Sequence, residues 1–352
     1  MIRKRTTIAD VAAAADVSAQ TVSNVVRGTG NMRDETRQRV ERVIREMDYR
    51  PNRSAQTLRS GVTKMLGVAI PYFDQPFCPM FVEYVARFTR ERGYGLVISL
   101  YGRDVDAAVA EARKINADGW IILSDVPVDG NEEVFGQDFP IVLAGDCLGQ
   151  GTVDAVMMPN VEAADYATQW LFDHGCEQVG MIGVAQRLVD DNGCFVSEEL
   201  NRVMHAVERN VDMRFRGYSQ AVVRNGRSLD ASIVVAVSAI TRQEGERQTE
   251  RLIASGHIPD GLFCANDAIA LGALSALRRH GIDVPGRVQV IGFDNTTDAH
   301  YMSPSLTSID PDVENYARYA VERLIARIEG DDQLPMVKIT SFRLVERETT
   351  RG

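Results

Sequence analysis

The sequence predicts a small all-α module followed by a larger α/β body made of two Rossmann-like halves. Three observations support this fold class. Short amphipathic segments fill the first 50 residues, apolar strand-like runs alternate with helical stretches from residue 65 onward, and those runs form two successive series. At 352 residues, the chain is also too long for one ordinary core.

The amino-terminal module contains three predicted helices. Thr7 is an N-cap for a helix through "IADVAAAAD", with Asp10 as its capping-box partner. Ser18 is the N-cap of a second helix, and Gly28 is a natural stop for it. A third helix is predicted within residues 33–52. Three short helices with a tight turn between the first two indicate a helix-turn-helix module.

The second helix has an apolar stripe and a polar, uncharged outer face. Its stripe is formed by Val22, Val25 and Val26. The outward positions are Ala19, Gln20, Ser23, Asn24 and Arg27. Gln and Asn side chains can bond the adenine edge in a major groove, which favours DNA binding. A three-helix bundle used for protein contacts is the alternative that the periodicity leaves open.

Charge is divided unevenly along the chain, whose net charge is −10. Residues 1–60 hold 12 Lys and Arg against 7 Asp and Glu, a net charge of +5, and the remainder carries −15. A basic module on an acidic body lets one end approach phosphates while the rest repels nucleic acid.

The segment "YRPNRSAQTLRSG", residues 49–61, includes a short stretch of potential helix that is too short to be stable alone. Its leucine, Leu58, lies near Arg53 and Arg59. A leucine wedged into a minor-groove base step between arginines would explain this pattern.

The body contains nine strand candidates in two series. The first comprises residues 65–71, 95–101, 119–124, 141–146 and 154–159, and the second comprises residues 178–184, 232–237, 261–266 and 288–294. Ligands in such sheets bind at the carboxyl ends of the strands. Polar side chains expected there are Asp146, Asn266, Asp267 and Asp294.

Several segments together resemble the lactose-repressor (LacI) family of bacterial transcription regulators: "TIADVAAAADVSAQTVSNVVRG", "YRPN" and "AQTLR". The resemblance implies that Ala19, Gln20 and Asn24 read bases and that Leu58 intercalates at the operator centre. It implies phosphate contacts from Thr7, Ser18, Thr21, Ser23, Tyr49 and Asn52. Ala55 and Arg59 complete the predicted DNA-binding set. Ala19 replaces a larger side chain common in relatives, which leaves one base position without its usual reader.

The resemblance extends over the body, which looks like a periplasmic-binding-protein type of effector domain through "RFRGY", "CANDAIALGALSALRRHGIDVP", "VIGFDN" and "SPSLTSI". It implies a small-molecule effector held by Arg214, Asn266 and Asp294, with Phe77 as an apolar wall. Asp146 and Ile240 complete the predicted site, and Ile240 stands where relatives often have an aromatic ring. A guanidinium, an amide and carboxylates suit the hydroxyls of a sugar. A purine, nucleoside or acidic metabolite is the alternative effector.

The expected domains follow from this resemblance. They are a DNA-binding domain over 1–50, a hinge helix and linker over 51–63, and an effector and dimerisation domain over 64–352. Within the last, one subdomain is expected over 64–160 and 311–331, and the other over 161–310 and 332–352.

Two features outside these motifs bear on assembly. Gly183 and Arg214 stand 31 positions apart, more than the family pattern requires. The extra segment, residues 188–210, places Leu200, Val203, Met204 and Val207 at helical spacing. It could form a lid, but a dimer contact or an indifferent surface insertion is favoured. No heptad-patterned tail follows "RLVERETT", so we expect a homodimer on a palindromic operator and no coiled-coil tetramer.

Composition excludes other classes of protein. No signal peptide and no run of about 18 apolar residues is present, so we expect a cytoplasmic, nucleoid-associated protein with no membrane partner. The five scattered cysteines and five histidines show no metal-binding spacing, and no metal or other cofactor is expected. GxGxxG after a strand, GxxxxGK[ST] and GxSxG are missing, which disfavours an enzyme, and the amino-terminal module disfavours a transport solute-binding protein.

Overall fold

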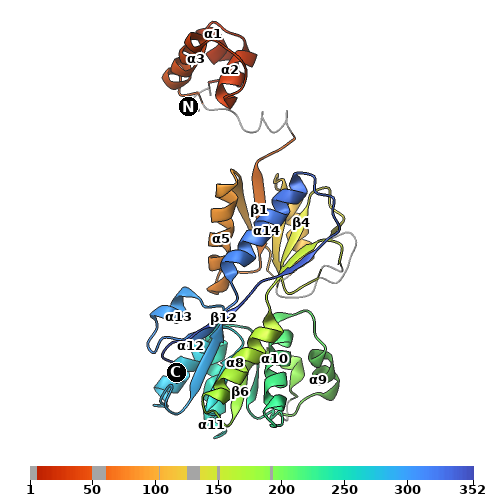
Figure 1. Cartoon of the computed structure of the whole chain (residues 1–352), viewed down its shortest axis with the longest axis vertical. Coiled ribbons are helices and arrows are strands. Elements are labelled where there is room, and N and C mark those ends of the chain that lie inside the picture. The colour runs from red at the N-terminus through yellow and green to blue at the C-terminus, as the bar shows by residue number, and fades with distance from the viewer. Residues whose placement is uncertain (1–5, 50–60, 103, 125–134, 149–150, 191–192) are drawn as a thin grey trace. The chain divides into compact units, whose positions relative to one another are not determined.

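The computed structural model describes residues 6–49, 61–102, 104–124, 135–148, 151–190 and 193–352. The chain divides into two compact units, Met1–Thr63 and Lys64–Gly352. The first unit is helical, and the second contains two six-stranded sheets flanked by helices (Figure 1). The predicted fold class is therefore confirmed.

Residues 6–49 of the first unit form the helices α1 (Ile8–Ala14), α2 (Ala19–Arg27) and α3 (Asp34–Glu46). Both predicted N-caps are confirmed, because Thr7 forms a capping box with Asp10 and the Ser18 side chain accepts a hydrogen bond from the Thr21 N–H. Gly28 ends α2 in a left-handed conformation, with φ at 66°. The core of this unit consists of Val11, Ala12, Ala15, Val22 and Val40.

The first sheet of the second unit has the strand order β11-β5-β4-β3-β1-β2 and is parallel throughout. Its strands are β1 (Met65–Ile70), β2 (Gly95–Leu100), β3 (Gly119–Ser124), β4 (Ile141–Gly145), β5 (Asp154–Met157) and β11 (Val337–Ile339). The helices against it are α5 (Phe77–Glu91), α6 (Val105–Ala112) and α14 (Val313–Ile328). The strands β1, β3, β4 and β5 are almost completely buried, as expected for a sheet with both faces covered.

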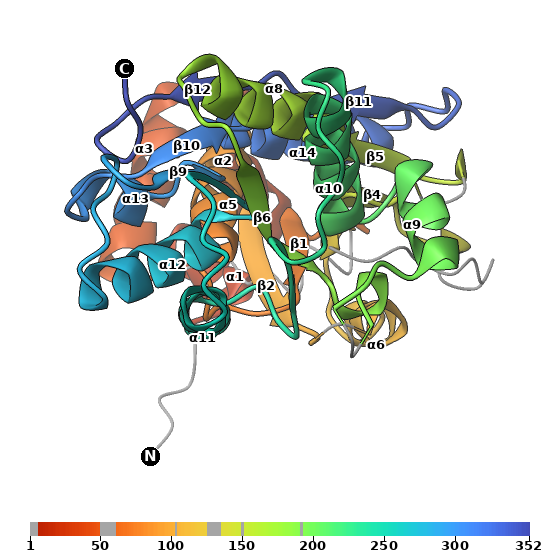
Figure 2. The same ribbon diagram turned by 90° about the horizontal axis from the view of Figure 1, so that it is seen from below.

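The second sheet has the order β12-β10-β9-β8-β6-β7, and only the β10–β12 pair is antiparallel. Its strands are β6 (Val179–Ala185), β7 (Val234–Val237), β8 (Gly261–Cys264), β9 (Gln289–Phe293), β10 (Thr307–Asp310) and β12 (Arg343–Val345). The helices α8 (Asn160–Asp173) and α10 (Asn210–Arg224) pack together, as do α11 (Arg242–Ala254) and α12 (Asp267–Arg279). Figure 2 shows the two pairs on opposite sides of β6. A short helix, α13 (Thr297–Tyr301), follows β9.

The chain passes between the two sheets three times: after β5, after β10 and between β11 and β12. This corrects one predicted boundary. Residues 332–352 were all expected in the second subdomain, whereas β11 pairs with β5 in the first sheet and only β12 joins the second. Both strands are three residues long, too short for a reliable alternation of apolar and polar side chains.

The extra segment before α10 forms a short 3-10 turn, η2 (Gln186–Leu188), and a helix, α9 (Ser197–Met204). Val203 is buried and Leu200 packs against the core, as the helical spacing predicts. Val207 lies beyond the end of α9 and is 57% exposed, so the predicted stripe ends one turn early.

Candidate functional site

The outer face of α2 is the first candidate site. Ala19 and Gln20 are exposed and Thr21, Ser23 and Asn24 are half-buried, while Val22 points into the core. The Gln20 Nε2 atom donates to Asn24 Oδ1 at 3.0 Å, so the two predicted base-reading side chains form one pair. Ser18 Oγ lies 2.9 Å from Thr21 Oγ1 at the start of the same helix.

The remaining predicted DNA contacts divide into two groups. Thr7 is exposed at the start of α1, and Tyr49 packs partly against the helical core, where burial raises the pKa of its phenol. Asn52, Ala55, Leu58 and Arg59 lie outside the described residues.

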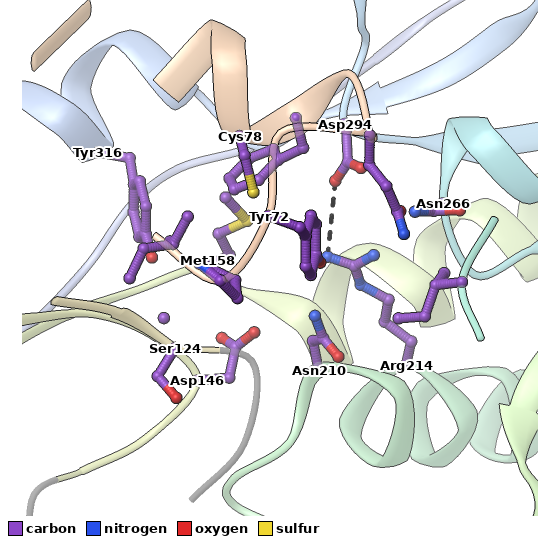
Figure 3. Close-up of a pocket in the computed structure, with 16 residues that line it drawn as sticks. Tyr72, Cys78, Ser124, Asp146, Met158, Asn210, Arg214, Asn266, Asp294 and Tyr316 are labelled. Atoms are coloured by element: carbon purple, nitrogen blue, oxygen red, sulfur yellow. Dashed lines mark ion pairs between the residues drawn. The ribbon is translucent and has the colours of Figure 1, made fainter. Parts of the chain in front are cut away.

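The second candidate site is a cavity between the two sheets, close to the carboxyl ends of β3, β4, β8 and β9 (Figure 3). All six residues predicted for effector binding line it: Phe77, Asp146, Arg214, Ile240, Asn266 and Asp294. They come from six different elements or loops, separated by up to 217 positions in the sequence. The strand-end rule thus selected three of its polar groups, Asp146, Asn266 and Asp294. Asp267, the fourth residue expected at a strand end, does not line the cavity, and its carboxylate accepts from the Thr296 N–H and the Ser308 hydroxyl.

Arg214 on α10 is the central cation of this cavity. Its Nε donates to Asn160 Oδ1 at 2.8 Å, its Nη1 donates to the carbonyl of Ala265, and its guanidinium lies 3.6 Å from the centre of the Phe293 ring. Burial lowers the pKa of Arg214, and the carboxylates of Asp294 and other nearby aspartates oppose this shift. A guanidinium held on three sides presents its remaining edge in one orientation.

Asp294 follows β9 and faces Arg214, with 3.7 Å between Oδ1 and Nη2. Its backbone has φ at 108°, a conformation that is costly for a residue with a side chain and is concentrated at functional sites. Burial raises the pKa of Asp294 to about 8, although Arg214 lowers it. The carboxylates of Asp267 and Asp146 raise it further.

Asn266 and Asp146 complete the polar lining. Asn266 is the N-cap of α12, where its Oδ1 accepts from the Ile269 N–H at 2.9 Å, so its amide nitrogen is turned toward the cavity (Figure 3). Asp146 follows β4, and its Oδ1 accepts from Asn160 Nδ2 at 2.6 Å. Asn160 therefore links Asp146 of one subdomain to Arg214 of the other.

Sequence reasoning missed several residues of the site. Tyr72, Gln75, Cys78, Ser124, Met158, Asn210 and Tyr316 also line the cavity. Ser124 ends β3, so the strand-end rule could have found it. Tyr316 lies on α14, far along the chain, and no local pattern points to it.

The cavity has a volume of about 50 Å³, which is room for a few water molecules. Sites for small organic ligands are commonly several hundred Å³. A sugar-sized ligand therefore requires the two subdomains to move apart from this arrangement.

Among the helices of the described part of the chain, none combines the length and apolar character needed to cross a bilayer.

Two family models match the chain. Residues 7–52 match the bacterial regulatory proteins of the lacI family, and residues 168–350 match a periplasmic-binding-protein-like domain. A solved LacI-type transcription regulator from Bifidobacterium animalis subsp. lactis is 38% identical, covering 82% of this chain and 99% of its own, with a TM-score of 0.76.

Two further comparisons concern regulators called CelR. The curated HTH-type transcriptional regulator CelR of Thermobifida fusca is 29% identical over 99% of both chains. A solved CelR–cellobiose complex is 27% identical, covers 98% of this chain and 100% of its own, and has a TM-score of 0.69.

Proposed function

We propose, from the premise that this chain belongs to the LacI family of bacterial transcription regulators, that it represses transcription from an operator under the control of a sugar. The observation that carries the effector part is the convergence of the six predicted residues on one cavity. The helix-turn-helix unit supplies the DNA-binding part.

On DNA, α2 enters the major groove with Gln20 and Asn24 toward the bases, while Ser18 and Thr21 at its start contact phosphates. A palindromic operator presents two equivalent half-sites, so the functional form is a homodimer with two recognition helices. Leu58 is proposed as the hinge residue that enters the minor groove between the half-sites.

The cavity lining favours a sugar. Arg214, Asn266, Asp294 and Asp146 offer donors and acceptors for several hydroxyl groups, and Phe77 and Tyr72 supply aromatic surface. Cellobiose, present in the solved complex of a relative, is the first compound to test. We propose binding without turnover, since the relatives named above are regulators.

Control follows from differential affinity. The sugar binds one arrangement of the two subdomains better than the other, and the operator does the same. Each ligand therefore changes the affinity of the protein for the other by the same factor. Because the operator is chromosomal DNA, the protein acts in the cytoplasm.

Two measurements test this proposal. Selection of duplexes from a random library by the full-length protein should yield a palindrome whose affinity falls steeply with salt. A thermal-shift screen of sugars, sugar acids and nucleosides should find a sugar that raises the melting temperature through mass action. Failure to select a palindrome contradicts the DNA-binding proposal, and stabilisation by a nucleoside or an acid instead contradicts the sugar proposal.

A further inference from the structure

The segment between α9 and α10 reaches from the second subdomain to the first. The Leu148 N–H donates to Oε1 of Glu208 at 2.6 Å, and the Arg209 N–H donates to the carbonyl of Asp146 at 3.0 Å. Both partners lie directly after β4 of the first sheet. These two hydrogen bonds join the subdomains beside the cavity, apart from the three chain crossings.

The segment is held on its own side by ion pairs. Arg187 of η2 contacts Glu199 of α9, with 2.9 Å between Nε and Oε2, and also pairs with Asp212 of α10. The Arg216 Nη1 atom on α10 donates to the carbonyl of Ala206 at 3.1 Å. The side chains of Glu199 and Asp212 are only 16% and 7% exposed, so solvent screens these pairs weakly. The extra segment is therefore fixed to α10 by these ion pairs and hydrogen bonds.

The backbone at the end of this segment is strained. Arg209 has φ at 66° in a residue with a side chain, and it stands at the N-cap of α10. Its N–H is the donor to Asp146, and the next residue, Asn210, lines the cavity. The hydrogen bond from Arg209 to Asp146 thus has a cavity-lining residue on each subdomain, Asn210 next to the donor and Asp146 as the acceptor.

We propose that Glu208 is a positioning residue for the effector site. Its carboxylate accepts a charge-assisted hydrogen bond from the Leu148 N–H, which holds Asp146 against the start of α10 in this arrangement of the subdomains. Glu208 does not line the cavity itself, so it acts on the effector only through Asp146 and Asn210. This inference rests on the proposed function for the identity of the ligand, and on the structure alone for the contact.

The first test needs no ligand. Amide hydrogen exchange is measured at Leu148 in the full-length wild type and in Glu208→Ala, Glu208→Gln and Glu198→Ala. Glu198 is an exposed residue on α9 of the same extra segment and provides the control. Glu208→Ala should exchange about tenfold faster at Leu148, because a hydrogen bond to a charged group is lost. Glu208→Gln keeps an acceptor and should stay close to the wild type, as should Glu198→Ala. Equal exchange rates at Leu148 in all four proteins would show that Glu208 does not accept a hydrogen bond from the Leu148 N–H.

The second test uses calorimetric titration with cellobiose, or with the sugar found in the thermal-shift screen. The dissociation constant should fall about tenfold in Glu208→Ala, because the lost hydrogen bond stabilises the arrangement that the sugar must open, and it should return toward the wild-type value in Glu208→Gln. An unchanged constant in Glu208→Ala overturns the positioning role. Failure of the proposed function is distinguishable, because the wild type itself would then bind no sugar while the exchange result at Leu148 would stand.

Discussion

The Nη2 atom of Arg214 lies 3.7 Å from Oδ1 of Asp294, and both side chains are almost completely buried. This separation is longer than a direct hydrogen bond, so each charged group retains capacity to bond a third group placed between them. Breaking a buried ion pair by removing one partner usually costs more than the pair contributes. The relationship therefore suits a site in which a ligand bonds both side chains from the space between them.

Asp294→Asn should make the stability of the protein less dependent on pH. The pKa of Asp294 is raised to about 8, above the value near 4 of an unfolded aspartate. As pH rises between these values, the unfolded chain releases a proton that the folded chain keeps, so wild-type stability falls. The variant lacks this loss, and its melting temperature relative to the wild type should increase between about pH 5 and about pH 8. Calorimetry checks this, with the exposed Asp332→Asn as the control. A constant difference across that range would contradict the raised pKa.

Arg214→Lys should abolish the response to sugar and leave operator binding intact. Lysine keeps the charge but loses the flat contact on Phe293 and the Nε donor to Asn160. We expect a loss of about 2–5 kcal/mol in effector binding free energy. Titration calorimetry and gel shift measure the two activities separately. Arg224→Lys, at the exposed end of the same helix, should retain both. A normal sugar response in Arg214→Lys would remove Arg214 from the site.

Gln20→Ala should relax operator specificity at one base pair in each half-site. The side chain is exposed, so the free energy of unfolding should change little. Discrimination between bases at the contacted position should fall by about 1–3 kcal/mol. Competition binding with single-base variants of the selected operator measures it, and Gln38→Ala on the exposed face of α3 is the control. Uniform weakening across all operator variants would instead assign Gln20 to phosphate contact.

Gly217→Ala should destabilise the second unit. A Cβ atom at this position would lie 2.1 Å from the carbonyl oxygen of Val161 on α8, so α8 and α10 would have to move apart. Overpacking of this kind costs about 1–3 kcal/mol. Chemical denaturation of the variant and of Gln220→Ala, an exposed control on α10, compares the two effects. Wild-type stability in Gly217→Ala would show that the helices have room to separate.

Local signals accounted for most of the fold. The caps at Thr7, Ser18 and Gly28 each act through atoms within a few residues, so the sequence alone specified them. The long apolar strands were recognisable because both faces of their sheets are buried. The short strands β10, β11 and β12 were not, since none of them lies in a long apolar run of sequence and their pairing depends on distant partners.

The cavity was predictable to the extent that strand ends and family motifs mark it. Asn160 was not predicted because its partner, Arg214, lies 54 positions away in the sequence. Asn210 was not predicted because it lines a cavity whose wall is formed by both subdomains. The hydrogen bond between Glu208 and Leu148 joins residues 60 positions apart and has no counterpart in any local pattern. Such long-range pairings require the folded arrangement.

The three passages of the chain between the two sheets restrict how the subdomains move. A single connecting strand would allow swinging and twisting in many directions. Three neighbouring connections act together as a hinge, so the main motion left to the subdomains is rotation about one axis. A small molecule in the cavity then needs to shift the equilibrium of only this one rotation, so little of its binding free energy is spent on restricting other motions.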